Sequence, residues 1–329
     1  MKALVTGITG FIGSRLAARL VGEGHTVDGL VRHSSERELS RLRKVISQIH
    51  LIEGDLGRFH SVLSAVEASE PNVIFHLGAL TPVRLSFDDP YPYINTNFDG
   101  TVNLVHAALK ETPNARLIVA STAEVYGWQK DVEPIREEVP LNPASPYAVA
   151  KVAADNYVQM ANRIYHLQGT ILRPINSYGR TGESGFLVEY LVSKMLSGET
   201  CYVGAPDSVR DYMFADDHVT AYVEAARNPE AVGKVYNVSP GNPVTNAELA
   251  KKLAQMTGFK GKIVFGSYPP GYPRRPKSHD PTYLVLDSSK ISKELGWKPK
   301  YTLDEGLRLT IEMWKSEMKH QPLFGQFLP

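Results

Sequence analysis

Tyr147 and Lys151 stand four residues apart in a segment whose pattern predicts a helix over residues 146–166. Ser145 is a suitable N-cap and Pro146 fits the first helical position, so the two side chains lie on one helix face. A phenol has an ordinary pKa of about 10, and a nearby ammonium group lowers it. The pair could therefore exchange a proton with a hydroxyl group. Because Y-x-x-x-K is common on helices, its meaning depends on the rest of the chain.

Three glycines, Gly7, Gly10 and Gly13, follow an apolar strand and precede an amphipathic segment. The first permits a tight turn, the second a close approach of backbone to phosphate, and the third close packing of helix and strand. Free N–H groups at the following helix N-terminus favour an anion. The stretch therefore predicts a dinucleotide site that includes Phe11 and Ile12. The alternative is a glycine-rich strand-to-helix turn without a ligand.

The end of the second predicted strand indicates which dinucleotide is bound. An acid there favours NAD, whereas an arginine accommodates the 2′-phosphate of NADP. Arg32, Ser34 and Ser35 occupy this place, so NADP is favoured and NAD is the alternative. Asp55, followed by Leu56, could reach the adenine amine after the third strand. The charged run 36–44 is interpreted as a solvated helix face.

Short β-branched runs alternate with helical patterns through the first half of the chain, which predicts an α/β Rossmann fold with a doubly wound parallel sheet. The dinucleotide-binding domain is expected over residues 1–174 and a smaller α/β substrate domain over 175–329, with one strand near 234–238 returning to the first sheet. The other expected strands are 2–6, 26–31, 50–53, 72–77, 116–121 and 169–173, and the expected helices are 11–23, 59–69, 97–111 and 146–166.

The overall composition excludes several classes of function. Lys plus Arg number 36 and Asp plus Glu 35, so no strong field favours nucleic acid or an anionic membrane. The single cysteine, Cys201, allows neither an intramolecular disulfide nor a cysteine-based zinc site, and no metal site is expected. With no secretory signal and no apolar run near the roughly 18 residues of a membrane span, we expect a soluble, cytoplasmic protein.

The joint occurrence of several motifs resembles the extended short-chain dehydrogenases/reductases, the group of nucleotide-sugar epimerases and dehydratases. This resemblance implies a Rossmann domain that binds NAD(P), with Leu77 and Ala79 among the cofactor contacts, and a smaller domain that binds a nucleotide sugar. The motifs are TGxxGxxG at 6–13, HLGA at 76–79, STAEVYG at 121–127, the Tyr147/Lys151 pair, RPINSYG at 173–179, RDYMFADD at 210–217 and ELGWKP at 294–299.

The reaction is indicated mainly by STAEVYG. By resemblance, Thr122 hydrogen-bonds the sugar O4, and Glu124 matches the glutamate with which 4,6-dehydratases remove the C5 proton. GLVRHSS at 29–35 and SFDDP at 86–90 most resemble GDP-mannose 4,6-dehydratase, although Ala123 replaces its usual serine. The alternatives are a nucleotide-sugar 4-epimerase, which needs no base at position 124, a decarboxylase, and a cofactor-binding sensor without turnover.

The resemblance also implies substrate contacts. Arg210, Arg275 and Asn176 match positions that approach the diphosphate of the nucleotide sugar, with Thr81 and Ser86 near the hexose. For each arginine the alternative is a surface or interdomain salt bridge.

The expected helices at 97–111 and 146–166 carry apolar stripes beyond what one core needs. In this family such helices pair with their copies in a four-helix bundle, so a homodimer is expected.

Overall fold

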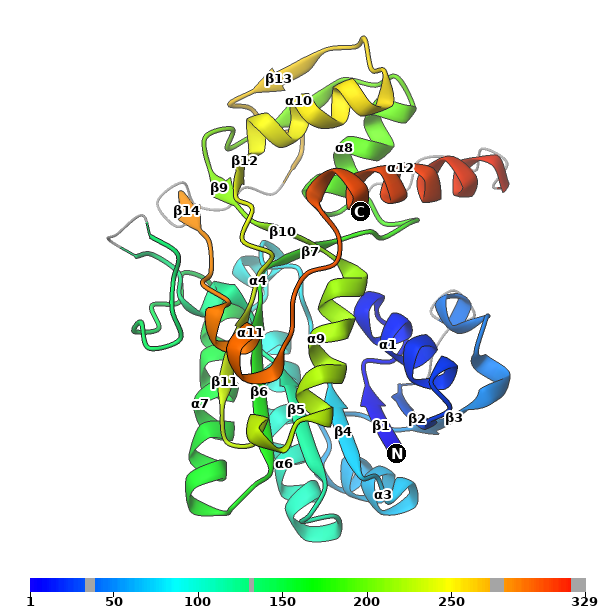
Figure 1. Cartoon of the computed structure of the whole chain (residues 1–329), viewed down its shortest axis with the longest axis vertical. Helices are drawn as coiled ribbons and strands as arrows, with labels where there is room; N and C mark the ends of the chain where they lie inside the picture. The colour runs from blue at the N-terminus through cyan, green and yellow to red at the C-terminus, as the bar shows by residue number, and fades with distance from the viewer. Residues whose placement is uncertain (33–38, 130–132, 273–280, 321–329) are drawn as a thin grey trace.

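The computed structural model describes residues 1–32, 39–129, 133–272 and 281–320 (Figure 1). A seven-stranded sheet has the order β11-β6-β5-β4-β1-β2-β3, and every neighbouring pair is parallel. The order reverses between β1 and β4, which confirms the Rossmann architecture. The strands are β1 (Lys2–Thr6), β2 (Thr26–Val31), β3 (Ile49–Glu53), β4 (Val73–His76), β5 (Arg116–Ala120), β6 (Gly169–Pro174) and β11 (Val235–Val238).

Helices cover both faces of this sheet. Alternate strand residues point to opposite sides, so Val5 and Phe75 belong to one apolar cluster whereas Leu4 and Ile74 belong to the other. One face packs against α1 (Phe11–Gly22), α9 (Ala215–Arg227) and α11 (Ser289–Leu295), and the other against α3 (Phe59–Ser69), α6 (Gly100–Glu111) and α7 (Pro146–Ile164).

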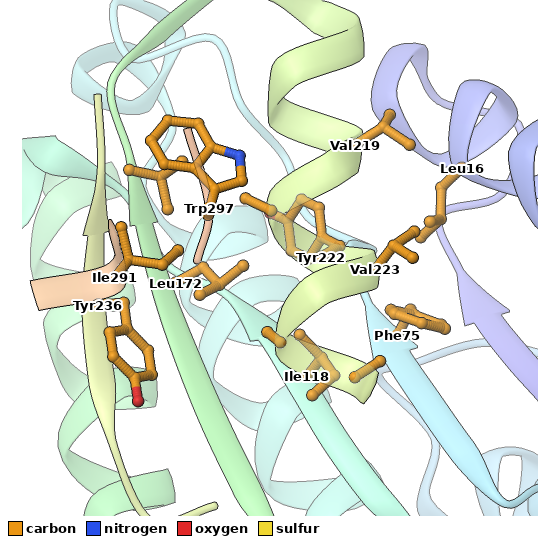
Figure 2. Close-up of a cluster of buried hydrophobic side chains, with 14 of the residues drawn as sticks. Leu16, Phe75, Ile118, Leu172, Val219, Tyr222, Val223, Tyr236, Ile291 and Trp297 are labelled. Atoms are coloured by element: carbon orange, nitrogen blue, oxygen red, sulfur yellow. The ribbon is translucent and has the colours of Figure 1, made fainter. Parts of the chain in front are cut away.

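The cluster under α9 joins parts of the chain that are far apart in sequence. Figure 2 shows Val219, Tyr222 and Val223 on α9 packed among side chains of α1, the sheet and Trp297. Trp297 is buried and donates a hydrogen bond to the Asp217 carbonyl (3.1 Å). The chain from α9 onward therefore contributes directly to the core of the large sheet.

A second group of elements lies beyond the carboxyl ends of the large sheet, at the top of Figure 1. Its core includes buried residues of α8 (Leu187–Leu196), α10 (Asn246–Thr257) and α12 (Leu303–His320). Its short strands pair as β7 (Asn176–Tyr178) with β10 (Tyr212–Phe214), β9 (Val209–Arg210) with β12 (Val244–Thr245) and β14 (Tyr283–Leu284), and β8 (Cys201–Val203) with β13 (Ile263–Phe265). A division of the chain at residue 174 stays a prediction.

Short helical turns connect these elements. They are η1 (Ser40–Leu42), η2 (Ile46–Gln48), α4 (Leu85–Asp88), α5 (Tyr91–Tyr93), the π-helical η3 (Ile94–Asp99), η4 (Ala123–Val125) and η5 (Pro229–Ala231). Among the described residues, no helix is both long and apolar enough to cross a membrane.

Candidate active site

The glycine turn has the shape that its sequence predicts. Gly7 has φ +70°, and a Cβ there would lie 2.7 Å from the Gly78 nitrogen. A Cβ on Gly13 would lie 2.1 Å from the Gly7 carbonyl oxygen, so α1 packs against the turn at a distance that only glycine allows. Gly10 is the N-cap of α1. The exposed backbone and the helix N-terminus fit the pyrophosphate of a dinucleotide.

A cavity of about 470 Å³ extends from this turn over the carboxyl ends of the central strands. Its lining comes from both groups of elements, which is where open α/β sheets bind ligands. The predicted site residues that line it are Gly7, Gly10, Phe11, Ile12, Gly13, Arg32, Asp55, Leu56, Leu77, Ala79, Thr81, Thr122, Glu124, Tyr147, Lys151 and Asn176. Ser34, Ser35 and Arg275 lie outside the described residues.

Helix α7 presents the tyrosine and the lysine to this cavity. Its N-cap is Ser145, whose hydroxyl accepts a hydrogen bond from the Ala148 N–H (3.1 Å), and Pro146 follows as expected. The Lys151 ammonium donates to the Ala120 carbonyl at the end of β5. This contact fixes the first turns of α7 against the strand that leads into Thr122.

Burial dominates the protonation behaviour of this pair. It raises the pKa of the Tyr147 phenol well above its ordinary value. A hydrogen bond with Thr122 acts to lower this pKa, and the charge of Glu124 acts to raise it further. This direction is opposite to the one expected from the Lys151 ammonium alone. Burial also lowers the pKa of Lys151 to about 8, and the nearby Asp155 opposes that shift. Glu124 is therefore close enough to the phenol to influence its charge.

Two predicted substrate contacts do not line the cavity. Ser86 is fully buried behind Tyr147, where its hydroxyl accepts from the Tyr147 N–H (3.1 Å) and donates to the Val83 carbonyl (2.6 Å). Arg210 is buried on β9, and its guanidinium donates to the carbonyl oxygens of Val209 (2.9 Å) and Pro281 (2.6 Å). A substrate contact at either residue stays a prediction.

The family described as GDP-mannose 4,6 dehydratase matches residues 4–310. The chain belongs to this family. It is 35% identical to the UDP-glucose 4-epimerase of Mycolicibacterium smegmatis, over 96% of this chain and 99% of that protein. It is 30% identical to the dTDP-glucose 4,6-dehydratase of Haemophilus influenzae, over 95% and 98%. The solved dTDP-glucose 4,6-dehydratase of Streptomyces venezuelae, with NAD bound, has a TM-score of 0.85 and 27% identity, over 97% and 98%.

The chain is thus an enzyme of the nucleotide-sugar dehydratase and epimerase family with an NAD-binding Rossmann fold. Its relatives include both kinds of reaction. Solved structures of both kinds of enzyme hold NAD: the UDP-glucose 4-epimerase of Thermus thermophilus and the dTDP-glucose 4,6-dehydratase of S. venezuelae.

Buried residues outside the predicted site connect the segments that line the cavity. His76, at the end of β4, is hydrogen-bonded to Thr6 through Nδ1 (2.8 Å) and to Thr101 through Nε2 (2.9 Å). The Asn97 amide in η3 is paired with both the N–H (2.8 Å) and the carbonyl (3.0 Å) of Leu80. HLGA at 76–79 signals the first residue, but its partners come from distant elements.

A buried polar network connects α7 and β6 to Ser121, which follows β5 and directly precedes Thr122. The Asp155 carboxylate, one turn after Lys151, accepts from the Ser121 hydroxyl (2.7 Å) and from the Arg173 guanidinium (2.9 and 3.0 Å). Arg173 also donates to the Tyr126 hydroxyl (2.8 Å), which donates to Asn237 on β11 (2.7 Å). The network connects α7, β6 and β11 to the loop that carries Thr122 and Glu124.

The charged run 36–44 is interpreted from the sequence as a solvated helix face, and its residues 36–38 lie outside the described residues. Arg41 on η1 is exposed, but it also lines the cavity and donates to the Thr9 carbonyl (3.2 Å), which the interpretation does not include. Its partner across the cavity, Glu183, comes from the second group of elements. No local pattern in the sequence connects these two residues.

His218 on α9 is a further residue that was not predicted and that lines the cavity. Its ring lies between the Ser177 hydroxyl (2.8 Å) and the Tyr222 hydroxyl (3.1 Å). Burial lowers the pKa of His218 to about 3, so the imidazole is neutral at physiological pH.

Proposed function

We propose that the protein is an NADP-dependent nucleotide-sugar 4,6-dehydratase, with GDP-mannose as the favoured substrate and a 4-keto-6-deoxy sugar nucleotide as the product. The observation that carries the proposal is the position of Glu124. Its carboxylate lines the cavity that also holds Tyr147 and Lys151, and it acts electrostatically on the Tyr147 phenol.

A carboxylate at this place suits the removal of a proton from carbon. Once the sugar C4 is a ketone, its neighbour C5–H is acidic, but a positioned base must still take that proton. A 4-epimerase has no such step. Glu124 therefore distinguishes the two reactions on chemical grounds.

Each polar group then has one task. Once its phenol is ionised, Tyr147 takes the proton of the O4 hydroxyl. Burial raises the pKa of this phenol, so it opposes the ionisation and makes the phenolate a strong base, and Thr122 acts in the opposite direction. Glu124 removes the C5 proton and passes it to the departing C6 hydroxyl, so that one water leaves. Ala123 is buried and offers no side-chain donor, which leaves this transfer to Glu124 or to water.

The residues at the dinucleotide end support NADP. Arg32 follows β2 and lines the cavity, at the position where NAD-specific Rossmann folds carry an acid. A nicotinamide dinucleotide held by these residues would supply hydride transfer away from C4 and back to C6, as C5 regains a proton, so the reaction would need no net oxidant or reductant. NAD is the alternative, because the dTDP-glucose 4,6-dehydratase of S. venezuelae has NAD bound.

A 4-epimerase is the second candidate. The M. smegmatis relative at 35% identity carries that name, and the H. influenzae dehydratase is 30% identical. An epimerase would use Tyr147, Lys151 and Thr122 in the same way and would leave Glu124 as a structural residue.

Mass spectrometry of the reaction products distinguishes these functions. The protein is incubated with GDP-mannose, dTDP-glucose and UDP-glucose in turn, each with NADP and with NAD. We expect a product lighter by one water from GDP-mannose with NADP. A product of unchanged mass and altered retention would establish an epimerase. Dinucleotide binding without a product from any donor would favour a sensor.

The variant Glu124→Gln tests the role of the carboxylate. We expect cofactor reduction to proceed and water loss to stop, observed as a rise in absorbance of the reduced cofactor without a lighter product. Glu138→Gln is the matched control, since Glu138 is exposed and does not line the cavity. Full dehydratase activity in Glu124→Gln would refute the proposal.

We further propose that the protein is a homodimer. Two apolar residues of α7, Val149 (52% exposed) and Ile164 (62%), lie on the surface. Tyr91 (78%) is exposed on α5, which contacts α7. Light scattering should give twice the chain mass of 36.4 kDa. Val149→Glu should halve that value if α7 forms the interface.

A further inference from the structure

Residues 180–186, here called the strap, connect β7 to α8 and contact the dinucleotide turn of the large sheet. The Arg180 guanidinium lies over the rings of Phe11 (4.2 Å to the centroid) and Phe186 (3.8 Å). Arg180, Glu183 and Phe186 all line the cavity. The strap therefore forms part of the cofactor site, although it comes from the second group of elements.

The two ends of the strap are held differently. Arg180 donates to the Ser177 carbonyl (2.7 Å) and is paired with the buried Glu189 (3.3 Å). Glu183, in contrast, is 40% exposed and is paired with Arg41, which is 33% exposed. Gly182, directly before Glu183, has φ +71°, and the nearest atom to a Cβ there would be 3.9 Å away. Glu183 is therefore held by fewer and more exposed contacts than Arg180.

The Glu183–Arg41 pair lies beside the expected phosphate position. Arg41 donates to the carbonyl of Thr9, which directly precedes the N-cap of α1. A helix N-terminus and an arginine side by side favour an anion. A carboxylate in the same place is repelled by any phosphate that binds there, because like charges a few ångströms apart interact unfavourably.

We propose that a phosphate group of the dinucleotide displaces Glu183 from Arg41. Glu183 is then an internal competitor for the phosphate, and Arg41 is a cofactor-binding residue. The exchange couples cofactor binding to the position of the strap. This inference rests on the proposed dinucleotide cofactor, but it does not depend on which sugar reaction follows.

The test is a double-mutant cycle on cofactor affinity, measured by titration calorimetry with NADP and with NAD. The variants are Glu183→Gln, Arg41→Gln and the combination of both. Glu183→Gln should lower the NADP dissociation constant about two- to five-fold at low salt. The change is small because exposed ion pairs are weak. The effect should shrink in high salt. Arg41→Gln should raise the NADP dissociation constant about ten-fold or more, as expected for a charged hydrogen bond.

The coupling between the two substitutions shows whether Glu183 competes for Arg41 or only adds negative charge near the cofactor. With Arg41→Gln already present, Glu183→Gln should leave the affinity unchanged within about two-fold. The control is Glu23→Gln, which removes another arginine-paired carboxylate at the far end of α1 without touching the cavity. It should not change the affinity.

The comparison of NADP with NAD shows which phosphate group of the dinucleotide binds Arg41. A loss confined to NADP in Arg41→Gln assigns the 2′-phosphate, and an equal loss with both assigns the pyrophosphate. The inference is refuted if Glu183→Gln fails to tighten binding or if Arg41→Gln fails to weaken it. If the unaltered chain binds neither dinucleotide, the proposed function fails as well.

Discussion

The two ends of the cavity are built in different ways. At the reaction end, Tyr147 and Lys151 are buried, and the Asp155–Arg173 pair behind them has side-chain exposures of 0% and 3%. At the strap end, Arg41 and Glu183 are partly exposed and joined across the cavity. Under the proposed function, the groups that hold the reacting atoms have buried partners, whereas the groups that receive the charged cofactor have partly exposed ones.

The largest expected effect comes from the reaction end. Tyr147→Phe removes the only phenol that we assign to proton transfer, so kcat should fall by about 10²–10⁴-fold. Steady-state turnover measures this loss, and circular dichroism checks the fold. The control is Tyr93→Phe, because Tyr93 packs edge-on against Tyr147 but its hydroxyl donates to the Pro82 carbonyl. Comparable losses in both variants would contradict the assignment.

The next effect concerns stability. Arg173→Met should lower the free energy of unfolding by about 3–5 kcal/mol, because it leaves the Asp155 carboxylate buried without its cation. Arg136→Met is the comparison: its pair with Asp287 (3.2 Å) is largely exposed on the arginine side and should contribute about 0–1 kcal/mol. Urea denaturation measures both. Equal losses would remove the contrast between a buried and an exposed ion pair.

A third prediction concerns pH. Burial lowers the pKa of His218 to about 3, so the folded chain keeps this residue neutral while the unfolded chain protonates it near its ordinary 6.5. The unfolded state therefore binds more protons as the pH falls below that value, and the stability decreases. Between pH 7.5 and 5, His218 should account for about 2 kcal/mol of this loss. His218→Gln should lose correspondingly less over the same range, and identical losses would contradict the buried neutral imidazole.

The smallest effect is expected at the strap end. Glu183→Gln should change the free energy of unfolding by less than about 1 kcal/mol, because the pair with Arg41 is partly exposed. The same variant should still change cofactor affinity. Thermal unfolding without cofactor gives the first quantity. A loss above 2 kcal/mol would mean that the strap end is as structurally important as the reaction end.

Much of the fold could be predicted because it depends on local patterns. Alternating β-branched and amphipathic segments predict the strands and helices, and the glycine turn needs the three glycines at their observed spacing. The expected helix at 97–111 is the informative exception. Residues 94–99 form the π-helical η3, in which Asn97 is buried against Leu80, and α6 begins only at Gly100. The local pattern predicts a helix in this segment but not its π-helical turn, in which Asn97 is hydrogen-bonded to the loop residue Leu80.

The pKa of Tyr147 also could not be predicted from the local sequence. The spacing of Tyr147 and Lys151 predicts a phenol with a lowered pKa, but burial raises it. The burial of Tyr147 depends on which elements pack against α7. The residues near Tyr147 in the sequence do not show which elements these are.

The amino-acid sequence by itself determined the strands and helices of the Rossmann fold, the dinucleotide turn and the Tyr147–Lys151 pair, because each of these depends on residues close together in the chain. Only the tertiary structure decided that Ser86 supports Tyr147 from behind, that Arg210 is bound to backbone carbonyls, and that Arg41 meets Glu183 across the cavity. These contacts join residues 61, 71 and 142 positions apart. Over such separations the packing of the whole chain, rather than any local preference, sets which side chains meet.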